Sequence, residues 1–330
     1  MILRLPNPLS AVAWLAFLLP AASLGSRADL LFAAAVLPLA IVVLATQPAP
    51  WEARGASVQA VKVFALLEAA WLVSYVYSAA FNGIRIGPLD LAELPRYALA
   101  GALTLYAIRH YDARVHASVA LAAAAAPYAS LALPSVDPYG YLSVLALCWQ
   151  LFFARGRARW AHAAAAALAV ALHGGPAAWA AALLAAAAAL AVRHPRGRGR
   201  PAALFFALLY LAAAACALRA APTRAAALVR GSPLLGWGPA RYEAVPAGLS
   251  QYAVWLVTGG ALGEALVLAG VSLAAWRLLR ACAADPRRLA GAAAFLGGAA
   301  LTAAGAPVLE SYRLFFATVF LTAAMHEAGR

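Results

Sequence analysis

The chain has little charge and few of the polar side chains that a water-exposed surface needs. Of its 330 residues, 11% are charged and 65% are hydrophobic. This composition excludes soluble globular domains, because polar residues are too few to cover them, and it excludes intrinsic disorder. Three cysteines are too few for a disulfide-rich scaffold. We therefore predict an all-α, polytopic membrane protein.

The common sequence signatures of catalytic sites are also missing. The chain contains no GxGxxG after a strand, no P-loop, no HExxH, no GxSxG and no CxxC motif. Its six histidines show no metal-binding spacing, and Cys148, Cys216 and Cys282 lie far apart in apolar surroundings or just past a span end. We expect no metal, no cofactor, and a packing role for each cysteine.

Apolar runs broken by proline, glycine and charge predict about 12 membrane spans, with a range of 10 to 12. The predicted spans are 8–24, 30–47, 59–80, 94–108, 115–133, 138–154, 160–173, 176–192, 202–220, 250–276, 288–305 and 307–325. The seventh and eighth are short and divided by Gly174, Gly175 and Pro176, so they form either two spans or a re-entrant hairpin. We interpret residues 1–330 as a single integral domain of the plasma membrane.

The net charge of +13 comes from arginines in short clusters between the apolar runs, such as those within 155–159 and 193–200. Basic loops remain on the cytoplasmic side of a membrane. In the twelve-span arrangement with both termini inside, about twice as many basic residues lie inside as outside. This placement favours that orientation over a role in nucleic-acid binding.

The longest loop, residues 221–249 between spans nine and ten, departs from this charge rule. Four arginines lie in or beside it on the predicted outer side: Arg219, Arg224, Arg230 and Arg241. Planar guanidinium groups bind phosphates with two parallel hydrogen bonds, so the cluster predicts an anion site. A loop helix lying on anionic lipid headgroups is the alternative.

The stretch from this loop into span ten reads SPLLGWGP (232–239) and then QYAVWLVTGGALG (251–263). These segments are similar to the turn, the tyrosine and the glycine-rich span of the O-antigen ligase and polymerase superfamily, which the chain therefore resembles. The turn residues are Pro233, Gly236 and Gly238, and Tyr252 matches the tyrosine. The segments VDPYGYLSVLAL (136–147) and HGGPAAWAAALLAAAAAL (173–190) are similar to two upstream family segments.

The resemblance implies a fold of about a dozen spans and a metal-independent glycan transfer at the outer face of the membrane. The donor is a polyprenyl-diphosphate-linked glycan, and the acceptor is a lipid, a glycan or a protein. The four loop arginines are then the donor-phosphate ligands. Leu249 and Ser250 replace a His-Asn pair of the family, and Gly175 and Pro176 replace a Ser-Arg pair.

Because the family's loop histidine is missing, the catalytic candidates are Glu243, Gln251 and Tyr252, with His173 as another nearby group. A carboxylate such as Glu243 acts as a general base near neutral pH if burial raises its pKa. Two alternatives remain open. One is a carrier or flippase for an anionic lipid-linked compound, with Glu68 and Glu264 lining its path. The other is a divergent relative without catalytic activity.

Overall fold

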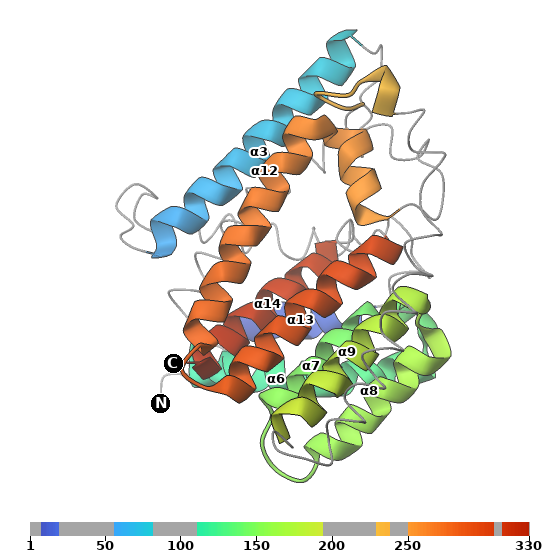
Figure 1. The fold of residues 1–330 in the computed structure, drawn as a ribbon, viewed down its shortest axis with the longest axis vertical. Helices are drawn as coiled ribbons and strands as arrows, with labels where there is room; N and C mark the ends of the chain where they lie inside the picture. Colours follow the sequence, from blue (N-terminus) through green and yellow to red (C-terminus); the bar gives the residue numbers. More distant parts are fainter. Residues whose placement is uncertain are drawn as a thin grey trace. The chain divides into compact units, whose positions relative to one another are not determined.

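The structure is a computed structural model, and it describes residues 8–19, 56–81, 111–193, 229–237, 250–306 and 312–329. Every regular element in these ranges is a helix, as the sequence predicts (Figure 1). Five helices are long and apolar enough to cross a membrane. They are α3 (Ala56–Phe81), α6 (Ala113–Ala132), α9 (Pro176–Arg193), α12 (Gln251–Cys282) and α13 (Pro286–Gly305).

The remaining helices are shorter. They are α1 (Pro8–Leu18), the 3-10 turn η2 (Pro134–Val136), α7 (Tyr141–Phe152), α8 (Arg159–His173) and α14 (Tyr312–Gly329). The predicted spans 160–173 and 176–192 form separate helices, α8 and α9, because Gly174 and Gly175 interrupt the apolar run. The predicted spans 30–47, 94–108 and 202–220 lie outside the described residues.

The chain divides into two compact units, and each is described by itself. The first comprises residues 1–32, 111–220 and 276–330. Its centre is α7, of which residues 141–150 are all buried. Helices α6, α8, α9, α13 and α14 contact α7 (Figure 1). Close packing here depends on small residues, since a Cβ added to Gly298 of α13 would lie 3.1 Å from Val144 Cγ1.

The second unit comprises residues 33–110 and 221–275. Within it, α3 lies alongside the part of α12 before residue 276 (Figure 1). Leu67 and Trp71 of α3 form a buried cluster with Leu266 and Val267 of α12. Helix α12 is interrupted at Gly260, which has non-helical dihedral angles.

Candidate functional site

The segment 229–237, which carries the PLLGW letters of the family-like motif, is a tight turn in the second unit. A short helical turn ends at Gly231. Ser232 Oγ then donates to Gly236 O at 2.6 Å, and Gly236 N donates back to Ser232 O at 3.1 Å. Gly236 has a φ of 68°, a left-handed conformation that only glycine adopts readily. Two of the predicted turn residues, Pro233 and Gly236, therefore lie in a turn, whereas Gly238 lies outside the described residues.

This turn is inserted into the break of α12. Gly260 has φ 62° and ψ −172°, so the two N–H groups that follow cannot bond to carbonyls four residues earlier. They bond to the turn instead. Ala261 N donates to Pro233 O at 2.9 Å, and Leu262 N donates to Leu234 O at 3.1 Å.

The carbonyls that the break releases are bonded as well. Trp237 N donates to Val257 O at 2.7 Å. Ser74 of α3 supplies the remaining donor, because its Oγ lies 2.6 Å from Thr258 O and 2.9 Å from Leu235 O. The turn, the break and α3 together thus satisfy buried backbone groups that would otherwise be costly to leave unpaired.

Both glycines of this arrangement are required by close backbone approach as well as by their dihedral angles. A Cβ on Gly236 would overlap Thr258 O, and a Cβ on Gly260 would overlap Leu234 O. The neighbouring Gly259 is different, since no described atom lies within 4 Å of its Cβ position. The two motifs that the sequence shows 24 residues apart are therefore one structural feature, here called the turn–break site (Ser74, 232–237 and 257–262).

Several sequence-predicted residues lie at or near this site. Arg230 is exposed, one residue before the turn glycine Gly231, and Pro233 is exposed within the turn. Gln251 is completely buried at the first position of α12. Tyr252 is half-buried and packs edge-on against Trp255, with ring centroids 5.9 Å apart. The remaining predicted site residues lie outside the described part of the chain: Arg219, Arg224, Gly238, Arg241 and Glu243.

Two further family-like segments meet in the first unit. The Asp137 carboxylate is buried and accepts the backbone N–H groups of Leu142 and Ser143 at 3.1 and 2.8 Å, so it caps the start of α7. Gly140, with φ 69°, faces the break between α8 and α9. A Cβ there would lie 2.8 Å from Gly174 Cα.

His173, a candidate for the missing base, ends α8 next to that break. Its Nε2 atom is buried and has no hydrogen-bond partner among the described residues. No group of three potential metal ligands occurs in the described ranges. Trp179 Nε1, from α9, donates to Val170 O at 2.9 Å and so holds the two sides of the break together.

Sequence reasoning missed Ser74 and Thr258. Nothing marks one serine in an apolar helix as the partner of a carbonyl 184 residues away. Only the packing of α3 on α12 brings the two together. A signal was present for Asp137, because an acidic residue shortly before an apolar run is a favourable helix cap.

The comparisons with known proteins give no assignment. No protein-family model and no curated protein matches the chain. The functional interpretation therefore depends on the motifs and on the geometry of the turn–break site.

Proposed function

We propose that the chain is a plasma-membrane glycan transferase, a ligase or polymerase that uses a polyprenyl-diphosphate-linked glycan as donor. The proposal includes about 12 spans, cytoplasmic termini, and the loop 221–249 on the outer face. An acceptor hydroxyl attacks the anomeric carbon of the donor glycan, and the bond from that carbon to the diphosphate oxygen breaks. Polyprenyl diphosphate leaves, and the hydroxyl proton passes to a base, for which Glu243 is the candidate.

The turn–break site is the observation that carries this proposal. The two segments that suggested the family, 232–237 and 257–262, interlock through three backbone hydrogen bonds and through Ser74. A turn held in this way fixes the position of segment 232–237 relative to the part of α12 that follows the break at Gly260. This is the rigidity that a site for positioning a donor requires.

The exposed side chains of the turn suit an amphiphilic donor. Arg230 offers a cation, while Leu234 and Leu262 are 70% and 49% exposed. Leu262 N bonds to Leu234 O, so these two apolar residues are neighbours. A polyprenyl diphosphate presents the matching combination of a charged group and a hydrocarbon chain. Arginine contacts would also stabilise the departing diphosphate without a metal.

Binding of a polyprenyl-diphosphate glycan to the full chain in nanodiscs tests the proposal. We compare the native protein with Arg219→Ala, Arg224→Ala and Arg230→Ala, and with Arg114→Ala as a control that removes one exposed charge at the start of α6. Loss of one charge-assisted contact costs about 1.5–3 kcal/mol, so the Kd rises by roughly ten- to hundredfold. The Arg114→Ala variant keeps the native Kd.

Transfer is then measured with Glu243→Gln and Gln251→Ala. Loss of glycan transfer with unchanged donor binding supports a catalytic role for the altered residue. Donor binding without any transfer by the native chain, together with movement of the lipid between leaflets, would instead favour a carrier or flippase. Absence of donor binding would overturn the proposal in favour of a non-catalytic relative.

A further inference from the structure

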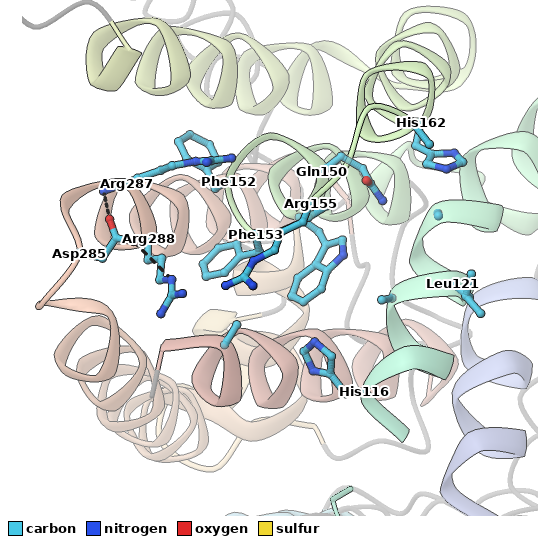
Figure 2. Close-up of a pocket in the computed structure, with 16 residues that line it drawn as sticks. His116, Leu121, Gln150, Phe152, Phe153, Arg155, His162, Asp285, Arg287 and Arg288 are labelled. Carbon is cyan, nitrogen blue, oxygen red and sulfur yellow. Dashed lines mark hydrogen bonds and ion pairs between the residues drawn. The ribbon is translucent and has the colours of Figure 1, made fainter. Parts of the chain in front are cut away.

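A cavity of about 680 Å³ lies in the first unit, where five helix ends meet. The starts of α6, α8 and α13 and the ends of α7 and α14 all contribute to its walls. Figure 2 shows side chains from these elements around the cavity. From the sequence, the arginines that line this cavity are interpreted only as a signal for membrane topology. No residue of the turn–break site lines the cavity.

The polar lining of the cavity is rich in hydrogen-bond donors. Arg155, Arg287 and Arg288 line it, and Asp285 is the one acidic residue among the described residues of the lining. Asp285 is already engaged: its Oδ1 accepts Arg287 N at 2.9 Å, and its Oδ2 pairs with Arg288 Nε at 3.3 Å (Figure 2). The lining therefore keeps an excess of positive charge.

Gln150 adds a buried donor to the same wall. The residue is 3% exposed, and its side chain lines the cavity. An amide that faces a cavity offers two N–H donors and one carbonyl acceptor to bound water or to a bound ligand. Figure 2 places this amide between Arg155 and His162.

Two histidines of the lining each lie within hydrogen-bond distance of a tyrosine hydroxyl. Tyr111 Oη lies 3.1 Å from His116 Nδ1, and Tyr128 Oη lies 3.2 Å from His162 Nδ1. Burial raises the pKa of the Tyr111 hydroxyl, and the charge of Glu327 raises it further, so this phenol stays protonated. Which atom of each pair donates depends on the histidine tautomer. In the tautomer whose Nδ1 accepts from the tyrosine, the ring carries its proton on Nε2, and that atom is a further donor.

More positive charge lies just behind the cavity. The guanidinium groups of Arg159 and Arg193 stack on the Trp160 ring, 4.8 and 4.2 Å from its centroid. The charges of Arg159, Arg193 and Arg288 all repel the positive charge of Arg287. Like charges gathered in this way repel one another, and an anion in the cavity would relieve that repulsion.

The rest of the wall is apolar. Phe152 and Phe153 line the cavity, and Phe153 stacks on Trp149 with centroids 5.6 Å apart. Leu121, also in the lining, is 60% exposed on α6, a helix long and apolar enough to span a membrane. This side of the cavity suits hydrocarbon, whereas a site for free phosphate needs no apolar side.

We propose that this cavity binds the phosphate-bearing headgroup of an anionic membrane lipid, with Arg155, Arg288 and Gln150 as ligands. Arginine and amide donors hold the phosphate oxygens, and the lipid chains lie along the face of Leu121. The arginine cluster thus has a binding function in addition to its effect on topology. The proposal is independent of the glycan transferase function, because it involves none of the residues of that site.

Lipid binding to the full chain in neutral detergent micelles tests this inference. The probes are dioctanoyl phosphatidylglycerol, dioctanoyl phosphatidylcholine and inorganic phosphate, and the readout is the fluorescence of tryptophan, with Trp149 in the cavity wall. We expect phosphatidylglycerol to bind at least about tenfold more tightly than either other probe.

The variants are Arg155→Gln and Gln150→Leu, with Arg157→Gln as the matched control. Arg157 is an exposed arginine of the same loop that does not line the cavity. Arg155→Gln and Gln150→Leu each weaken phosphatidylglycerol binding severalfold, whereas Arg157→Gln leaves it unchanged. The thermal unfolding temperature of each variant, measured alongside, confirms that it folds.

Three outcomes would overturn the inference. Equal loss of binding in Arg155→Gln and Arg157→Gln would show general attraction to a basic surface. Equal affinity for phosphatidylglycerol and phosphatidylcholine would exclude selection of an anionic headgroup. Inorganic phosphate binding as tightly as phosphatidylglycerol would assign the cavity to a free anion.

Discussion

The two described glycine breaks of this molecule, at Gly260 within α12 and at Gly174 between α8 and α9, use the same residue type for different reasons. At Gly260 the backbone adopts a left-handed φ, and a turn from elsewhere in the chain completes the hydrogen bonding of the interrupted helix. At Gly174 the φ is an ordinary −78°, and the need is for space, because a Cβ there would lie 2.6 Å from Val170 O and 3.0 Å from Ala178 Cβ. The reason for a glycine in an apolar run therefore follows from the residues that pack against it in the folded structure.

The substitution expected to have the largest effect is Gly260→Ala. It places a Cβ in a region of φ and ψ that is essentially restricted to glycine, and that atom overlaps the Leu234 carbonyl. The free energy of unfolding should fall by about 3 kcal/mol or more, measured by thermal unfolding in micelles. Gly259→Ala is the adjacent control, and it should be neutral or slightly stabilising. Equal effects of the two changes would contradict the interlocked turn.

Gly140→Ala tests the corresponding contact in the first unit. The substitution combines a φ of 69° with a Cβ 2.8 Å from Gly174 Cα, so we expect a loss of about 2 kcal/mol. The control is Gly175→Ala, since no described atom lies within 4 Å of its Cβ position. Chemical unfolding of the purified variants measures the difference. If Gly175→Ala is the more damaging change, packing at this break has been assigned to the wrong glycine.

Ser74→Ala asks how much of the turn–break site depends on a side chain. The change removes the donor that lies near both Thr258 O and Leu235 O, and it should cost about 1–3 kcal/mol because buried carbonyls lose their partner. Thr302→Val is the control. Among the described residues its hydroxyl donates to Gly298 O in its own helix, so the cost there should be below about 1 kcal/mol.

The smallest effect is expected for Trp179→Phe. Its indole donates to Val170 O, but that carbonyl also accepts Gly174 N at 2.8 Å and stays bonded without it. We expect the free energy of unfolding to fall by about 0.5–1 kcal/mol. The unfolding temperature measures this loss, and Trp276→Phe at a highly exposed position is the control. A loss as large as that of Ser74→Ala would show that the two breaks depend equally on side-chain hydrogen bonds.

Much of the helical layout was predictable from local chemistry. The boundaries predicted from apolar runs that end at proline, glycine or charge lie close to the observed helix boundaries. Examples are 59–80 within α3 (Ala56–Phe81) and 160–173 within α8 (Arg159–His173). The turn before α12 was predictable because a proline and two glycines lie within six residues. The roles of Glu243 and of the loop arginines Arg219, Arg224 and Arg241 remain predictions.

The sequence by itself determined that this chain is helical and apolar, because hydropathy and helix-breaking residues act over a few neighbouring positions. It also placed positive charge at particular helix ends. Only the tertiary structure decided that the turn at 232–237 completes the break at Gly260, and that Arg155, Arg287 and Arg288 line one cavity. The physical reason is distance along the chain: these groups meet only when helices pack, and no local pattern records which helices will do so.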